Sequence, residues 1–142
     1  MALGDTLADT LHSSIETNPQ YGTAKHGLIG LVRSAGPILY EKDRITLNAI
    51  CPAFVITNLC PPFIRDTFPK EHVTPMSTIM KAYDAFLDND DMTAQTVECT
   101  LDELHFRQMP EWANASQKWM GEGSDGFWER AYQKVAPARN GI

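Results

Sequence analysis

The sequence predicts an α/β fold, built as a single domain over residues 1–142. Two observations predict this class. Stretches with helical periodicity alternate with short apolar runs, and the alternation occurs twice along the chain. The composition agrees, because 43% hydrophobic and 21% charged residues are typical of a folded domain and not of a disordered one.

Helices are expected in four segments. The first covers residues 1–14, where leucines four apart share one helical face. The longest runs from Pro19 to Tyr40 and starts with a proline, which suits a first turn, while Pro37 is expected to loosen its last turn. A third helix is expected from Thr74 to Leu87 and a fourth from Ser124 to Val135.

Strands are expected after the second and third of these helices. Residues 44–51 (RITLNAIC) are apolar on both faces, which is typical of a buried strand, and residues 95–99 (QTVEC) form a shorter one. The tail after Thr100 is expected to be helical or irregular, and its aromatic side chains could roof an apolar pocket, fill the core or contact a second copy. In the helix from residue 74, the apolar positions predict a buried face made of Met76, Ile79, Met80, Tyr83, Phe86 and Leu87.

The charge and the apolar runs exclude several classes of partner. A net charge of −6 without a basic cluster offers nothing to neutralise nucleic-acid phosphates. No apolar run is long enough to cross a membrane, and the amino terminus does not have the pattern of a signal peptide. The three cysteines and four histidines lack metal-ligand spacing, so the chain is expected to carry reduced thiols and no metal in the cytoplasm.

Tyr21 and Lys25, in the segment YGTAK, are the first residues along the chain that suggest a catalytic role. They are four positions apart, so a helix places both polar ends on one face. A nearby ammonium favours the phenolate form of tyrosine, and such a pair could move a proton to or from an alcohol or carbonyl oxygen. The structural alternative is a tyrosine that packs on a lysine stem.

The sequence around this pair resembles a known family. YGTAKHGLIGLVRSAGPIL, followed by RITLNAICPAFVITNL, is similar to the part of short-chain dehydrogenase/reductases that follows their catalytic tyrosine. In that family a YxxxK helix leads to a strand that ends in an N-A-I-x-P-G type turn and a threonine. The later TPMSTIMKAYDAFLDNDDMTAQTVEC is similar to fungal members that resemble 15-hydroxyprostaglandin dehydrogenases, so the resemblance covers residues 19–100.

The resemblance implies the carboxyl-terminal half of a Rossmann-like fold. Its sheet would be partial and parallel, with few strands, flanking helices and a helix-rich tail over residues 101–142. Tyr21 would be the proton donor or acceptor, and Lys25 would assist it. For an NAD(P) cofactor, the backbone of Val55 and the side chain of Thr57 would provide contacts.

The sequence departs from the family in its amino-terminal part. Residues 1–18 precede the resemblance, and no glycine-rich G-x-x-x-G-x-G segment occurs, so NAD(P) binding is expected to be lost in this chain. The family's catalytic serine has no counterpart at the expected spacing, and Ser13 and Ser14 are the nearest candidates. Ala53 replaces the family's glycine after Pro52.

Three functions stay open at this point. The first is an oxidoreductase polypeptide acting on a small-molecule secondary alcohol or ketone, with the missing half supplied by another polypeptide. The second is a cofactor-independent isomerase, dehydratase or cyclase of secondary metabolism. The third is a non-catalytic protein that forms a homodimer to cover its sheet edge and an apolar helix face. Asn48, in the N-A-I motif, is expected to make a structural hydrogen bond.

Overall fold

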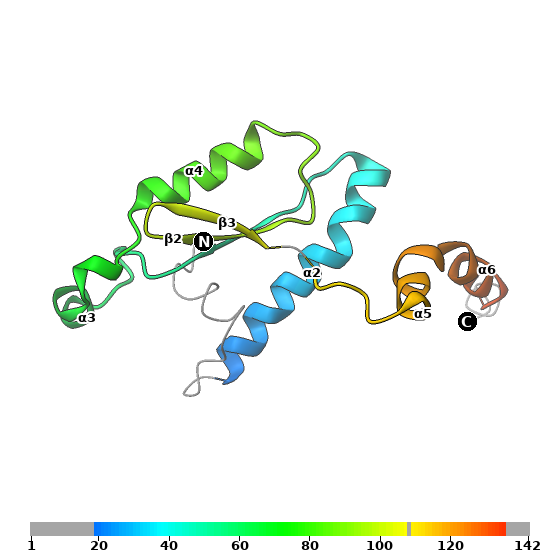
Figure 1. The fold of residues 1–142 in the computed structure, drawn as a ribbon, viewed down its shortest axis with the longest axis horizontal. Helices are drawn as coiled ribbons and strands as arrows, with labels where there is room; N and C mark the ends of the chain where they lie inside the picture. The colour runs from blue at the N-terminus through cyan, green and yellow to red at the C-terminus, as the bar shows by residue number, and fades with distance from the viewer. Residues whose placement is uncertain (1–18, 108, 136–142) are drawn as a thin grey trace, which may run out of the picture. The chain divides into compact units, whose positions relative to one another are not determined.

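The computed structural model describes residues 19–107 and 109–135, so the helix predicted at residues 1–14 lies outside the described residues. The chain divides into two compact units, with the boundary after residue 108. The described part of the first unit forms a partial Rossmann-like α/β layer arrangement, with the strands between α2 and α4 (Figure 1). Its elements are α2 (Pro19–Asp43), β1 (Ala49–Pro52), α3 (Pro62–Thr67), η1 (Lys70–His72), α4 (Met76–Leu87), β2 (Thr96–Thr100) and β3 (Glu103–Arg107).

The sheet is mixed, with strand order β1-β2-β3. β1 and β2 are parallel and place Cys51 opposite Glu98, while β3 returns antiparallel to β2 and places His105 opposite Glu98. Leu101, in the turn of this hairpin, has a φ of 50°. Its N–H is held by the Thr74 hydroxyl (3.0 Å) and its carbonyl by the Thr78 hydroxyl (2.5 Å). These two bonds from the start of α4 fix a turn that creates β3, a strand the sequence did not predict.

The core of the first unit lies between α4 and the sheet. Its buried members are Val55, Ile79, Ala82, Val97 and Cys99, and Ile50, Phe86 and Leu104 pack against them. The predicted buried face of α4 is wrong at four positions, because small residues, Thr78 and Ala82, let the helix approach the strands closely. The four bulky side chains that remain 47–75% exposed are Met76, Met80, Tyr83 and Leu87.

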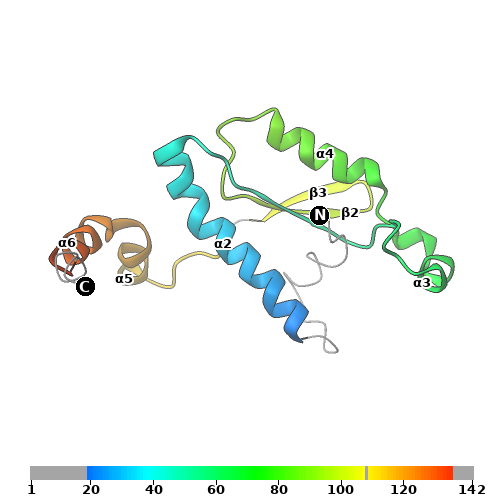
Figure 2. The ribbon, with the colours of Figure 1, turned by 180° about the vertical axis from the view of Figure 1, so that it is seen from behind.

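α2 covers the other face of the strands (Figure 2). Ile50 packs into the α4 core, so its neighbour Cys51 points to the opposite face, where α2 contacts β1. The residues that α2 buries recur three or four apart: Gly22, Lys25, Ile29, Val32 and Gly36. The helix continues past Pro37 to Asp43, so the first strand begins later than residue 44. Of the apolar residues in α2, Leu28, Leu31 and Ile38 stay about half exposed.

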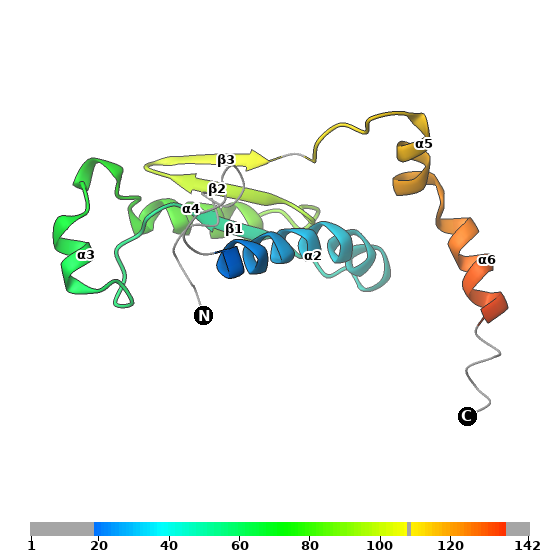
Figure 3. The same ribbon diagram turned by 90° about the horizontal axis from the view of Figure 1, so that it is seen from below.

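The second unit consists of α5 (Ala115–Lys118), the π-helical turn η2 (Trp119–Gly123) and α6 (Asp125–Val135), which Figure 3 shows from below. The indole N–H of Trp112 donates to Glu122 (2.8 Å), and its ring lies against Gly121, where a Cβ would come within 2.3 Å of the ring. A side chain at position 121 would therefore displace this ring. α6 agrees with the helix predicted at the end of the chain. The aromatic residues that contact one another along η2 and α6 are Trp119, Phe127, Trp128 and Tyr132.

Candidate functional site

The predicted pair lies in the first two turns of α2. The Lys25 ammonium is 5.1 Å from the centroid of the Tyr21 ring, so the two side chains share one helix face, as the spacing predicts. Lys25 is 6% exposed, whereas Tyr21 is half-buried. A cation over an aromatic face is attracted by the ring quadrupole, and the attraction increases where water is excluded. The ammonium is thus held against the ring in a protected position.

The buried face under α2 is charged. Glu98, in the central strand, is 4% exposed, and the Arg107 guanidinium bonds it through two nitrogens, with Nε at 2.8 Å from Oε2. Cys51 lies opposite Glu98 in the parallel pair, so the thiol and the carboxylate share the face of the sheet that α2 contacts. Buried ions are tolerated where opposite charges and hydrogen bonds compensate the lost hydration. The Glu98–Arg107 pair therefore keeps a carboxylate buried on this face. Sequence reasoning missed it, although a glutamate inside the apolar run QTVEC was a signal.

The Cys51 and Cys99 thiols stay protonated near neutral pH. Burial first, and the Glu98 carboxylate second, raise the pKa of the Cys51 thiol to about 12, and burial raises the pKa of Cys99 to about 11. Since the thiolate is the reactive form, neither group can serve as a nucleophile. All three cysteines are free and buried.

Val55 and Thr57 follow the carboxyl end of β1, the end of a parallel strand where ligands bind in α/β sheets. The Val55 side chain is 3% exposed and belongs to the core, so only its main chain could reach a ligand. The Thr57 hydroxyl accepts the N–H of Leu59 (3.3 Å), and its carbonyl accepts the N–H of Cys60 (3.0 Å). Thr57 thus closes a tight turn with Cys60, and the contact of Val55 and Thr57 with a cofactor stays a prediction.

Asn48 has the structural role that was expected. Its side-chain amide donates to the Met92 carbonyl (2.7 Å), and its oxygen accepts the N–H of Gln95 (3.0 Å). These bonds tie the segment before β1 to the segment before β2. The asparagine thus sets the start of the parallel pair.

Among the described residues, the remaining candidates form no second site. Ser13 and Ser14 lie outside the described residues. His26 is exposed, with Nδ1 2.9 Å from the Gly22 carbonyl. In residues 19–107 and 109–135, no three histidine, cysteine or acidic side chains are grouped as metal ligands, and no helix is long and apolar enough to cross a bilayer. A pocket of about 220 Å³ lies on α6 alone, lined by Phe127, Arg130, Ala131 and Lys134.

A dinucleotide does not fit the residues that the structure describes. Its pyrophosphate needs free backbone N–H groups at a glycine-rich helix start. In the first unit, α2 begins with Pro19, α3 with Pro61 and Pro62, and α4 with Pro75 as its cap. Proline has no N–H to donate. None of these helix starts has the glycine-rich turn that brings backbone N–H groups close to a pyrophosphate.

Three fungal proteins are similar to the chain. Short-chain dehydrogenase/reductase prx6 of Penicillium rubens is 31% identical over 100 residues, which are 70% of this chain and 34% of that protein. Short-chain dehydrogenase/reductase cdmF of Talaromyces verruculosus is 32% identical over 63 residues, 44% of this chain and 24% of that protein. Short-chain dehydrogenase/reductase prx7 of Penicillium rubens is 36% identical over 64 residues, 45% of this chain and 22% of that protein. The matched part thus spans about a third or less of these curated relatives, and no family model matches.

Proposed function

The chain contains a segment of the short-chain dehydrogenase/reductase family, which is an oxidoreductase family, and on this premise we propose that Tyr21 and Lys25 transfer a proton at the oxygen of a small-molecule alcohol or carbonyl. The observation that supports the proposal is the buried Lys25 ammonium, held 5.1 Å from the centre of the Tyr21 ring. A surface tyrosine packed on a lysine stem would leave the ammonium in water. Here the Lys25 ammonium lies on the buried side of α2.

In the reducing direction, the Tyr21 hydroxyl donates its proton to a carbonyl oxygen as negative charge develops there, and the tyrosine becomes a phenolate. In the oxidising direction, the phenolate accepts the proton of an alcohol. The Lys25 cation stabilises the phenolate in both cases, and its charge acts more strongly because little water screens it. General acid–base catalysis of this kind contributes about 10²- to 10⁴-fold to a rate.

Oxidoreduction of a secondary alcohol or ketone also needs a hydride donor or acceptor. In this family NAD(P) supplies that chemistry. Because the described residues do not fit a dinucleotide, we propose that residues outside this sequence hold NAD(P), on another polypeptide or a further segment. Isothermal titration of the chain with NAD and NADP should show weak binding or none, and micromolar binding would overturn this part of the proposal.

The proton-transfer role is tested with a panel of small alcohols and ketones, followed by NMR with and without NAD(P). Tyr21→Phe keeps the ring beneath Lys25 and removes only the hydroxyl, so any turnover should fall at least about 100-fold. Lys25→Met should also reduce turnover, because it keeps the stem and removes the charge. Tyr132→Phe and Lys42→Met, at exposed positions, are the matched controls and should not change the rate. Unchanged turnover in Tyr21→Phe would remove this residue from the mechanism.

A further inference from the structure

β3 is the outer strand of the sheet, and its far edge is open. The strand order is β1-β2-β3, so among the described residues no strand pairs with the side of β3 that is turned away from β2 (Figure 3). An open edge presents a row of backbone N–H and C=O groups to which a further strand can bond. Its side chains are accessible too, because Glu103 and Phe106 are exposed and the other three residues of β3 are half-buried.

Two residues of β3 direct their main-chain groups to the open edge. The Cys99 carbonyl accepts the N–H of Ala53 (2.8 Å) on the β1 side of β2, so the main chain of Cys99 points away from β3. In an antiparallel ladder, pairs that exchange hydrogen bonds alternate with pairs that do not. Cys99 and Leu104 are therefore a pair without hydrogen bonds, and so are Val97 and Phe106. The N–H and C=O groups of Leu104 and Phe106 consequently face the open edge.

The sequence of β3, ELHFR, is complementary to itself in the antiparallel direction. With a two-fold axis at His105, Leu104 lies opposite Phe106 of the partner subunit. These are the residues whose main-chain groups face outward, so each such pair exchanges two hydrogen bonds. Glu103 then lies opposite Arg107 of the partner subunit, which pairs opposite charges. The same patch thus serves both subunits, as a two-fold axis requires.

Other registers of two antiparallel β3 strands match less well. A shift by one residue sets outward-facing groups against groups that face β2, so the hydrogen bonds are lost. An axis at Leu104 keeps matched groups but leaves Arg107 beyond the end of the partner strand. An axis at Phe106 does the same to Glu103. The axis at His105 therefore satisfies both the main-chain groups and the charges.

Both faces of the joined sheets are matched as well. The Arg107 guanidinium bonds Glu98 through Nε and Nη2, and neither bond uses Nη1, which is left for Glu103 of the partner subunit. On the opposite face, Phe106 is 38% exposed, and Leu104 of the partner subunit would cover part of its ring. Cross-strand pairs of these two kinds each stabilise an antiparallel sheet.

We propose that the open edge of β3 pairs with β3 of a second copy of this chain, antiparallel about a two-fold axis at His105, so that two sheets become one. The occupant is a second copy because both the outward-facing main-chain groups and the terminal charges are complementary to themselves. Two five-residue strands cover less than the roughly 800 Å² per partner of a standard interface, so the dimer dissociates in the micromolar range or above. The contact does not depend on the proposed chemistry.

Cysteine cross-linking of the full chain tests the axis directly. Opposed residues in a pair without hydrogen bonds have Cα atoms about 4.5 Å apart, which a disulfide spans. His105→Cys should therefore link two chains when oxidised glutathione accepts the electrons of the two thiols. In the matched control Glu103→Cys, the two cysteines are four residues or about 14 Å apart along the strands, and no link should form. The native cysteines are buried, and non-reducing electrophoresis measures the linked fraction.

Substitutions at Phe106 separate main-chain pairing from the loss of the ring. Phe106→Pro removes the outward-facing N–H, and proline is tolerated on an edge strand where the N–H faces outward. Phe106→Val is the matched control, because it loses the same ring and keeps the N–H. In sedimentation velocity over a concentration series, Phe106→Pro should raise the dissociation constant at least about tenfold above that of Phe106→Val. Circular dichroism of each variant reports whether it is folded.

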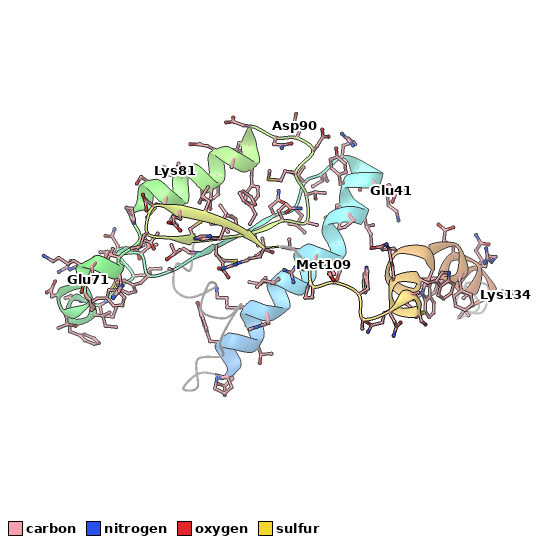
Figure 4. All side chains as sticks on the ribbon, viewed as in Figure 1. Glu41, Glu71, Lys81, Asp90, Met109 and Lys134 are labelled. Atoms are coloured by element: carbon pink, nitrogen blue, oxygen red, sulfur yellow. The ribbon has the colours of Figure 1, made fainter. Side chains whose placement is uncertain are left out.

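A charge reversal tests the register without touching the main chain. Glu103→Lys should weaken the dimer about threefold, because the new cation faces Arg107 of the partner subunit. Glu71→Lys makes the same change at the exposed residue of η1 that Figure 4 labels, and it should leave the dissociation constant unchanged.

The proposal is overturned if the chain stays monomeric over the whole concentration series. It is also overturned if Glu103→Cys links as readily as His105→Cys, because the axis is then not at residue 105. Equal dissociation constants for folded Phe106→Pro and Phe106→Val would contradict pairing through the main chain. Equal effects of Glu103→Lys and Glu71→Lys would contradict the register.

Discussion

Replacing Gly36 by alanine tests how α2 is seated on the rest of the first unit. A Cβ at this position would lie 3.0 to 3.1 Å from the nitrogen, Cα and Cβ of Ala94. Ala94 cannot easily retreat, because its N–H donates to the Leu47 carbonyl (2.8 Å) and its φ of 58° is already unusual for a residue with a side chain. The added methyl group therefore meets main chain that is held in place.

The magnitude follows from two opposing terms. A glycine-to-alanine change inside a helix gains about 1 kcal/mol of helix propensity. Overpacking of a tight contact costs about 1 to 3 kcal/mol. Gly30 lies in the same helix with nothing within 4 Å of its added Cβ, so Gly30→Ala keeps the whole gain. We expect Gly30→Ala to stabilise the fold and Gly36→Ala to be about 1 to 3 kcal/mol less stable than that control.

Urea unfolding followed by circular dichroism measures both variants against the unmodified chain. Both variants add the same methyl group to the same helix, so they differ only in the atoms that this methyl group contacts. Equal stabilisation by the two variants would refute the reasoning, since it would mean that α2 does not lie against Ala94. The seating of this helix, and with it the position of Tyr21 and Lys25 over the sheet, would then need revision.

Three further predictions concern other parts of the fold. Thr78→Val, which keeps the shape and removes the hydroxyl that bonds the Leu101 carbonyl, should cost about 1 to 2 kcal/mol and speed amide hydrogen exchange in the β2-β3 hairpin. Folding raises the pKa of the Cys51 thiol from 9.0 to about 12, so this thiol contributes its full stabilisation of the folded chain below pH 9 and loses it as the pH rises towards 12. In urea titrations, Cys51→Ala should therefore reduce the fall of the unfolding free energy between pH 9 and 12. An unchanged dependence of that free energy on pH would contradict this prediction. Asn114→Ala removes the oxygen that accepts the Gln117 N–H and should cost about 1 kcal/mol, seen as lost helicity by circular dichroism, whereas unchanged helicity would argue against this cap.

The sequence predicted the elements that have strong periodic signals. The helices from Pro19, from Thr74 and near Ser124 are present within a few residues of their predicted bounds, and so is the strand near Gln95. The first strand is shorter than expected, because α2 runs three residues past Tyr40 and the segment from residue 44 to 48 connects instead of pairing. Helix termini depend on tertiary contacts that no local pattern encodes.

The buried face of α4 and the strand β3 depend on packing and hydrogen bonding that sequence patterns do not reveal. Bulky apolar residues of α4 looked like its buried face, yet four of them stay exposed, and the small residues Thr78 and Ala82 are buried beside Ile79. β3 depends on bonds from Thr74 and Thr78 to Leu101, which are 23 to 27 residues apart in the sequence and give no local signal. The Tyr21–Lys25 pair was predictable from a spacing of four, since helix geometry alone brings such residues together.

The central claim is that α2 holds the Lys25 ammonium against the Tyr21 ring inside the protein. The most direct measurement is proton NMR of the side-chain methylene groups of Lys25, with the exposed Lys42 of the same helix as the reference. We expect ring-current shifts of the Lys25 signals and nuclear Overhauser contacts with the Tyr21 ring, both lost in Tyr21→Ala. Signals of Lys25 that match those of Lys42, with no contact to the ring, would contradict the account.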